Sequence, residues 1–195
     1  MNALSFIHSL KLIHCDLKPE NILMRSYSNC EVKVIDFGSS CFIHDNLSSY
    51  VQSRPYRAPE VIIGHKYDSK IDLWSLGCIL AELWTGSILF QNDSLQGLLA
   101  KIIGIIGPFP ENVVKESKLF YSFFNEKGLI FKGLSDGDKF NNFQNSLNEA
   151  SNFQVKAHFP GEIKRFQIII PKQTTLRNRL KTDDNNFYDF ICSLL

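Results

Sequence analysis

The 195-residue sequence lacks an excess of charge, a long apolar run and paired cysteines. Its 21 Lys and Arg residues nearly balance 20 Asp and Glu residues, so a net charge of +1 gives no overall field that would attract nucleic acid or an anionic membrane surface. No stretch approaches the roughly 18 to 20 consecutive apolar residues that a membrane-spanning helix needs. The five cysteines form no CxxC pair, which suits a reducing compartment. We therefore expect an intracellular protein, cytoplasmic or nuclear, that binds neither nucleic acid nor membranes.

Hydrophobic residues make up 44% of the chain, enough for one packed and mostly helical domain. The Ser-rich stretch over residues 36–56 is expected to form an exposed loop that is long enough to be functional. Residues 140–158 are rich in Asn and Gln without clear periodicity, which predicts a flexible surface insertion. Residue patterns predict helices over 1–13, 71–83 with Gly86 as its cap, 92–103 starting at Asn92 or Asp93, and 187–195, and strands over 21–24, 31–35 and 166–170.

The segment from His14 to Asn21 carries three polar groups at fixed offsets: Asp16, Lys18 and Asn21. Phosphoryl transfer needs a carboxylate that orients the attacking hydroxyl and accepts its proton, a cation near the transferred phosphate, and a metal ligand on the same rigid turn. These three residues can supply those roles in that order. Any one of them alone would be read as part of an ordinary turn.

Two further motifs follow in order along the chain. Asp36-Phe37-Gly38 comes directly after the predicted strand, where a carboxylate can reach Mg²⁺ that bridges nucleotide phosphates. Ala58-Pro59-Glu60 stands at the far end of the long loop. Each tripeptide alone is weak evidence, but the ordered set of three motifs is specific.

On these motifs the chain is identified as a member of the eukaryotic protein kinases, over its whole length except residues 140–158. The resemblance implies a mainly α (α+β) fold, the large lobe of a kinase, with a short β-hairpin that carries the catalytic loop and the Asp-Phe-Gly loop. It implies ATP and Mg²⁺ as cofactors, with Asn21 and Asp36 as metal ligands, and protein substrates. It also implies roles by motif position for Leu23 under the adenine, His14 and Phe37 in a stacked regulatory spine, and Asp72 as a brace for the catalytic loop. Core packing alone would equally explain Leu23 and Phe37.

Three features resemble the dual-specificity tyrosine-regulated kinases: Cys15 where most kinases have Arg, Ser39-Ser40-Cys41 after the Asp-Phe-Gly motif, and the segment from Tyr50 to Arg57. Residues 170–180 are similar to the branch of this family found in plants and protists. Such kinases phosphorylate an activation-loop tyrosine, here Tyr50, and then Ser and Thr of other proteins.

A phosphate on Tyr50 would carry about −1.5 to −2 charges, and Arg54 and Arg57 are the expected partners. The family often has a second tyrosine two residues earlier, where this chain has Ser48. Because a dual-phosphotyrosine loop is thereby excluded, Tyr50 is the one candidate. If the chain cannot modify itself, Tyr50 stays an unmodified loop residue.

A working kinase also has a Gly-rich loop over the phosphates, a strand Lys and a helix Glu, and none of these motifs is in the sequence. Kinases further pair the Glu60 position with an Arg beyond Leu195. We therefore expect a partial kinase domain over residues 1–195, truncated at both ends and inactive alone. The alternative is a non-catalytic lobe that acts as an interaction module. The sequence indicates no oligomeric state.

Cys15 and Cys41 flank the motifs closely enough to suggest a redox switch. The alternative is that both are ordinary thiols.

Overall fold

The computed structural model describes residues 1–45, 50–133 and 166–195. The described residues form eight α-helices, two 3-10 turns and three antiparallel two-stranded sheets. The helices and turns are α1 (Asn2–Ser9), η1 (Pro19–Asn21), η2 (Arg54–Tyr56), α2 (Pro59–Ile62), α3 (Lys70–Thr85), α4 (Leu95–Ile105), α5 (Glu111–Glu116), α6 (Phe120–Phe123), α7 (Leu176–Leu180) and α8 (Asn185–Leu194). The sheets pair β1 (Leu12–Ile13) with β4 (Cys41–Phe42), β2 (Ile22–Ser26) with β3 (Glu31–Val34), and β5 (Ile130–Gly133) with β6 (Phe166–Ile169). The architecture is thus a mixture of helices and small sheets.

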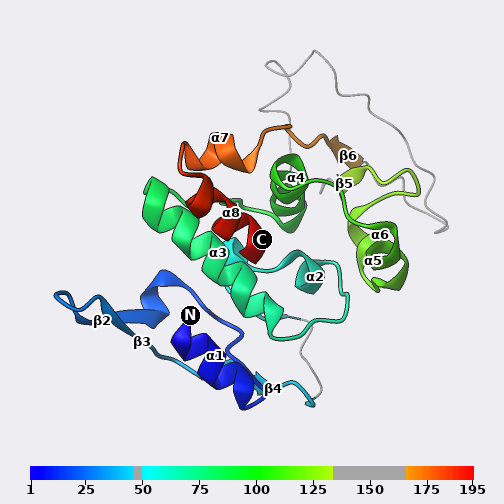
Figure 1. The fold of residues 1–195 in the computed structure, drawn as a ribbon. Coiled ribbons are helices and arrows are strands. Elements are labelled where there is room, and N and C mark those ends of the chain that lie inside the picture. Colours follow the sequence, from blue (N-terminus) through cyan, green and yellow to red (C-terminus); the bar gives the residue numbers. More distant parts are fainter. Residues whose placement is uncertain (46–49, 134–165) are drawn as a thin grey trace.

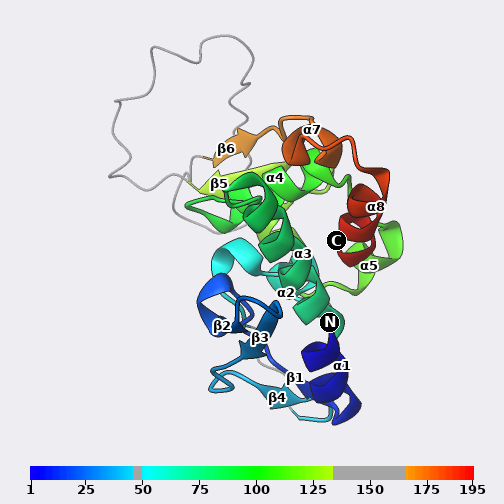
Figure 2. The ribbon, with the colours of Figure 1, turned by 60° about the vertical axis from the view of Figure 1, so that its left-hand side comes forward.

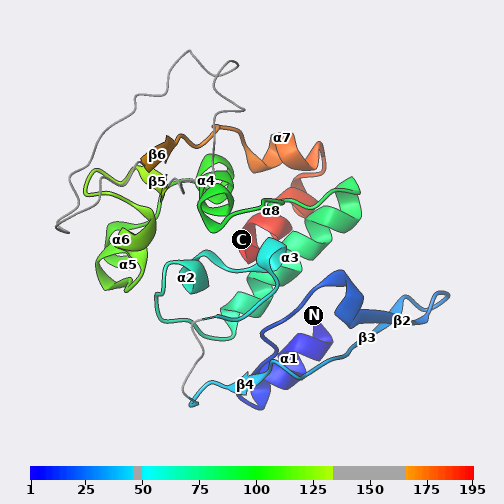
Figure 3. The ribbon, with the colours of Figure 1, turned by 180° about the vertical axis from the view of Figure 1, so that it is seen from behind.

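Helix α3 lies between two groups of elements (Figures 1 and 2). Helix α1, the β1–β4 pair and the β2–β3 hairpin lie at one end, and α4, α7 and the β5–β6 hairpin lie at the other. Seen from behind, α2 lies beside α3 on the side away from the β2–β3 hairpin (Figure 3). The central position of α3 explains its sequence, because a helix that is covered on several sides must be apolar nearly all round.

The predicted central helix is confirmed as α3, with Ile71, Cys78 and Ile79 in the core. It ends at Gly86, whose φ of 71° lies in the left-handed region and whose N–H donates to the Glu82 carbonyl at 2.8 Å. A side chain at Gly77 would meet Leu195 at 2.9 Å, so the absence of a Cβ lets the end of α8 pack closely on α3.

Two sequence-based boundaries need correction. The first helix ends at Ser9 rather than at residue 13, because Lys11 adopts a φ of 63° and the chain then enters β1. Ile13 is fully buried in β1, which pairs with β4, so its apolar side chain belongs to a buried strand and not to a further helical turn. Helix α4 is capped by Ser94, whose Oγ accepts from the Gly97 N–H at 3.1 Å, rather than by Asn92 or Asp93.

The remaining predicted elements are present with small shifts. Strands β2 and β3 begin at Ile22 and Glu31, and β6 ends just before Ile170 and Pro171. The last helix starts at Asn185, where the Asp184 side chain accepts from the Phe187 N–H. The expected insertion at 140–158 and Ser48 lie outside the described residues. None of the described helices has the length and apolar character to cross a membrane.

Candidate active site

The loop between β1 and η1 is held in place by the carboxylate of Asp72 on α3. Asp72 is fully buried, and its Oδ2 accepts from the His14 N–H at 2.8 Å while its Oδ1 accepts from the Cys15 N–H at 3.0 Å. The His8 ring nitrogen Nε2 on α1 lies 2.8 Å from the same Oδ2. Hydrogen bonds to a charged acceptor are among the stronger ones in proteins. They support the left-handed backbone of Cys15, whose φ is 66°.

Both carboxylate oxygens of Asp16 have partners. Oδ1 accepts from the Ser53 N–H at 2.9 Å and from the Ser53 hydroxyl at 2.7 Å, and Oδ2 lies 2.7 Å from Lys18 Nζ. Partial burial acts to raise the pKa of Asp16, but the hydrogen bonds from Lys18 and Ser53 outweigh it and hold the pKa below its usual value. The same contact with Asp16 raises the pKa of Lys18. At neutral pH the site therefore holds a carboxylate and an ammonium side by side.

His14 links the loop to the strand that follows. Its Nδ1 accepts from the Asp16 N–H at 3.3 Å and its Nε2 lies 3.0 Å from the Ile35 carbonyl, a pattern that fits a neutral ring with the proton on Nε2. The ring meets Phe37 edge-on, with 5.0 Å between ring centroids. The two residues predicted to share a spine are therefore in contact.

Asn21 and Asp36 stand at the base of the β2–β3 hairpin. The Ile35 N–H donates to the Asn21 carbonyl at 2.9 Å. This bond brings Asn21, which precedes β2, close to the residues that follow β3. Asn21 is buried, and its Nδ2 donates to the Asp16 carbonyl at 2.9 Å. Asp36 is exposed with a φ of 64°, and its Oδ1 accepts from the Gly38 N–H at 3.3 Å.

This pair fits a magnesium site, because amide and carboxylate oxygens suit Mg²⁺, which usually takes one or two protein ligands and completes its shell with phosphate and water. The described residues hold no group of three or more His, Cys, Asp or Glu side chains that could bind a metal. Leu23, on β2, is 49% exposed and Phe37 is 42% exposed, so both offer apolar surface close in sequence to Asn21 and Asp36.

Both predicted arginine partners of Tyr50 act on its hydroxyl, and each also donates to a backbone carbonyl. The Arg57 guanidinium carbon lies 4.2 Å from the centroid of the Tyr50 ring, and Arg57 also donates to the Val51 carbonyl at 2.8 Å. Arg54 also donates to the Asp93 carbonyl at 2.9 Å. The hydrogen bond and the charge of Arg57, with a smaller contribution from Arg54, lower the pKa of the Tyr50 hydroxyl. Tyr50 as a residue is 70% exposed and is therefore accessible to an enzyme.

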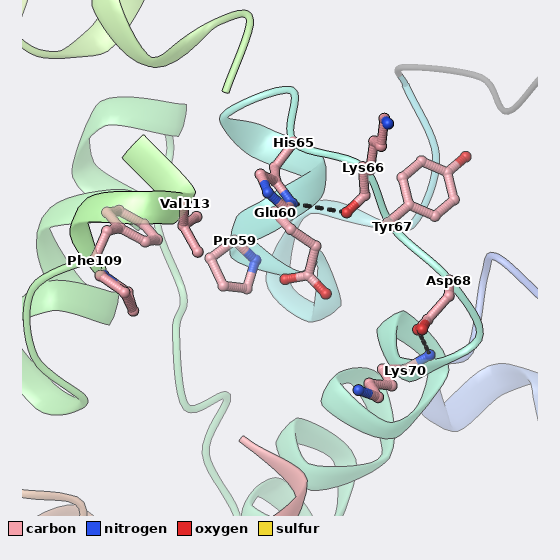
Figure 4. Close-up of a pocket in the computed structure, with 10 residues that line it drawn as sticks. Pro59, Glu60, His65, Lys66, Tyr67, Asp68, Lys70, Phe109 and Val113 are labelled. Carbon is pink, nitrogen blue, oxygen red and sulfur yellow. Dashed lines mark hydrogen bonds between the residues drawn. The ribbon is translucent and has the colours of Figure 1, made fainter. Parts of the chain in front are cut away.

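Glu60 borders a cavity of about 510 Å³ between α2, the start of α3 and the segment before α5. Figure 4 shows its carboxylate among Pro59, Lys70 and Val113. Burial raises the pKa of Glu60. Among the described residues no cation forms an ion pair with it, and His65 pairs with Glu116 instead at 3.5 Å. The arginine that the resemblance implies for Glu60 is thus not one of these residues.

Two groups in the site have no signal in the sequence near their partners. Ser53, which donates twice to Asp16, lies 37 positions further along the chain. His8 contacts Asp72 across 64 positions. Neither separation leaves a local pattern, so only the long-range fold could reveal them.

The comparisons with known proteins agree with the motifs. The model of the protein kinase domain matches residues 1–195. "Dual specificity tyrosine-phosphorylation-regulated kinase 3" of Mus musculus is 50% identical over 129 residues, which are 66% of this chain and 22% of that protein. The putative homolog of that kinase in Drosophila melanogaster is 48% identical over 141 residues, 70% of this chain and 17% of its own length. "Dual specificity tyrosine-phosphorylation-regulated kinase 4" of Homo sapiens is 48% identical over 128 residues, 66% of this chain and 25% of its own length.

The chain therefore spans about a quarter or less of the curated relatives it matches. It belongs to the protein kinase domain family, and within that family it is similar to the dual-specificity tyrosine-phosphorylation-regulated kinases.

Proposed function

We propose that the chain supplies the phosphoryl-transfer site of an intracellular protein kinase, which moves the γ-phosphate of ATP to Ser and Thr of protein substrates and to its own Tyr50. The observation that carries the proposal is the geometry of Asp16. Its carboxylate is ionised and fixed by Ser53 and Lys18, and the backbone carbonyl of Asp16 accepts from Asn21 Nδ2. A fixed carboxylate beside a cation and two oxygen ligands is the set that this reaction needs.

In the reaction, a substrate hydroxyl oxygen forms a bond to the γ-phosphorus while the bond from that phosphorus to the bridging oxygen of ADP breaks. Asp16 orients the hydroxyl and accepts its proton. Lys18 shifts from Asp16 towards the transferred phosphoryl oxygens, where its charge offsets theirs. Bound Mg²⁺, held by Asn21 and Asp36, would neutralise charge on the nucleotide phosphates. Leu23 would lie under the adenine.

A phosphate on Tyr50 would be held by Arg57, which already lies against the ring. Arg54, whose charge already acts on the Tyr50 hydroxyl while its Nη1 donates to the Asp93 carbonyl, would contribute a second guanidinium. Because Arg57 also holds the Val51 and Gln52 carbonyls, the phosphate would be tied directly to the backbone of the activation loop.

We further propose that the 195 residues form a partial domain that turns over little or not at all alone, because the sequence contains no Gly-rich loop and no strand Lys to hold the ATP phosphates. If no catalytic partner segment exists, the lobe is an interaction module.

Two proteins test the proposal: the 195 residues, and the same residues with whatever coding sequence precedes Met1 in the full-length messenger. Both are incubated with ATP, Mg²⁺ and a Ser/Thr-containing protein substrate, and phosphate incorporation is mapped by mass spectrometry. We expect phosphorylation from the extended form, its loss in Asp16→Asn and Asp36→Asn, and no loss in Asp183→Asn, which changes an exposed carboxylate between α7 and α8. Activity in neither form, or activity that survives Asp16→Asn, would refute the enzymatic proposal and favour the interaction module.

A further inference from the structure

Gln52 is a buried polar residue in a loop whose other side chains mostly meet solvent. Its side chain is 6% exposed. The amide Nε2 donates to the Ile71 carbonyl at 2.9 Å and to Ser75 Oγ at 2.8 Å, both on α3, and lies 3.4 Å from the Tyr56 carbonyl. The amide Oε1 accepts from the Ala58 N–H at 2.9 Å. A glutamine at the surface of an activation loop would not need a full set of buried partners.

The backbone of Gln52 is also fully used. Its φ is 68°, in the left-handed region that residues other than Gly and Asn rarely adopt. Its carbonyl accepts from Arg57 Nη2 at 2.7 Å, and its N–H donates to the Cys15 carbonyl at 2.9 Å. A strained conformation of this kind persists only where surrounding contacts enforce it, and here the contacts come from the Gln52 side chain and from Arg57.

The position of Gln52 connects α3 to the reacting groups. On one side its amide is bonded to Ile71 and Ser75 of α3. On the other side its N–H contacts the catalytic loop at Cys15, and the next residue, Ser53, donates both its N–H and its hydroxyl to Asp16 Oδ1. Ser53 follows Gln52 directly in a β-region backbone, and its own carbonyl accepts from the Tyr56 N–H at 3.0 Å, so Ser53 is placed between the turn at residue 52 and η2.

We propose that Gln52 is a positioning residue for phosphoryl transfer, whose buried amide holds the left-handed turn at residue 52 against α3 and so keeps Ser53 on the Asp16 carboxylate. The role rests on the proposed kinase function and does not involve contact with ATP or substrate. A glutamine that only filled space would give the core the same packing without setting the orientation of Asp16.

Three substitutions separate these roles. Gln52→Gly removes the amide but allows the left-handed φ at no steric cost, so it isolates the side-chain bonds from the backbone conformation. Ser75→Ala removes one partner of the amide from α3 and leaves Gln52 in place. Gln91→Leu is the control, because Gln91 is an exposed glutamine before α4.

The first measurement is amide hydrogen exchange at Ser53 in the 195-residue chain, by NMR, together with the thermal midpoint. In Gln52→Gly we expect exchange at Ser53 to accelerate about tenfold or more, since the bond to Asp16 loses its support. Ser75→Ala should give a smaller increase, the double variant should be less than additive, and Gln91→Leu should match the wild type.

The second measurement is steady-state kinetics in whichever of the two forms described above turns over. We expect kcat to fall about tenfold or more in Gln52→Gly, because the orientation of Asp16 is disturbed. The KM for ATP should change less than about twofold, because the substitution does not touch the nucleotide contacts. A general loss of folded protein would instead lower the active fraction and the thermal midpoint together.

The proposal would be overturned if Gln52→Gly showed the same exchange rate at Ser53 as the wild type and a kcat within about twofold of the wild-type value. A fall in kcat that is fully explained by a smaller folded fraction would overturn it as well. If Gln52→Gly does not fold, Ser75→Ala decides by the same two readouts. If neither form phosphorylates a substrate, the proposed function fails, and the exchange data alone decide whether Gln52 positions Ser53.

Discussion

Replacing Asp72 by Asn tests whether one buried carboxylate fixes the catalytic loop. The carboxylate accepts from two backbone N–H groups and faces the His8 ring, and it is fully shielded from water. An Asn side chain has the same shape but one accepting atom, so one buried N–H is left facing an amide N–H. That orphaned donor costs about 1 to 3 kcal/mol, and the loss of charge from the remaining bonds costs about 1 kcal/mol more.

We therefore expect Asp72→Asn to lower the free energy of unfolding by about 3 kcal/mol, a large part of the roughly 5 to 15 kcal/mol that a domain usually has. Urea denaturation followed by circular dichroism gives the value from the shift in midpoint at constant slope. Asp189→Asn, an exposed carboxylate on α8, is the matched control and should stay within about 0.5 kcal/mol. A loss below about 1 kcal/mol for Asp72→Asn would refute the reasoning, because it would mean that the loop holds without the charged acceptor.

Three more predictions concern the thiols, the activation loop and the cavity. The sulfurs of Cys15 and Cys41 lie 3.4 Å apart, and the pKa of Cys15 is raised mainly by burial and also by the neighbouring Cys41 thiol. Oxidised glutathione should therefore link the two cysteines in a disulfide slowly at neutral pH and faster as pH rises, measured as the loss of thiols that can be alkylated. A phosphate on Tyr50, introduced by semisynthesis, should raise the thermal midpoint in the wild type and raise it less in Arg57→Lys, since a lysine lacks the planar fork. Burial raises the pKa of Glu60, so the folded protein binds a proton at this carboxyl more tightly than the unfolded chain does, and the free energy of unfolding falls as pH rises from the unfolded pKa through the folded pKa. Glu60→Gln should therefore flatten the pH dependence of the urea midpoint and raise that midpoint at neutral pH.

Each of these has a control on the same chain. Cys30→Ser changes an exposed thiol and should leave the oxidation of the other two unaffected. Arg25→Lys, in a surface ion pair with Glu31, should leave the effect of the Tyr50 phosphate intact, and Glu126→Gln should leave the pH dependence unchanged. Unaltered alkylation, an equal phosphate effect in Arg57→Lys, or a pH dependence that persists in Glu60→Gln would contradict the respective prediction.

The sequence was most informative where local pattern and structure coincide. The helix around Cys78 and the strand pair after Asn21 follow from apolar and alternating runs that need no distant partner to be recognised, and the structure contains them as α3 and the β2–β3 pair. The end of the first helix was mispredicted because Ile13 fits a helical period and a buried strand equally well.

Side-chain partners were harder to predict than elements. Motif spacing led to Asp16, but nothing near it in the chain indicates Ser53, and nothing near Arg54 indicates that its guanidinium contacts the Asp93 carbonyl. These contacts depend on how the loop folds back on α3 and on the start of α4. The roles assigned to the site residues remain predictions, whereas the contacts among them are now defined.

The β5–β6 hairpin makes the chain a natural acceptor for inserted sequence. Gly133 and Phe166 are paired neighbours, so the two ends of the segment between them are joined by the sheet, where strands lie about 4.8 Å apart. The entropy cost of closing a loop on such a base rises by only about 0.6 kcal/mol for each doubling of its length. A change in the number of residues between Gly133 and Phe166 is therefore expected to cost the β5–β6 pair little, and this pair lies at the opposite end of α3 from the catalytic loop (Figure 2).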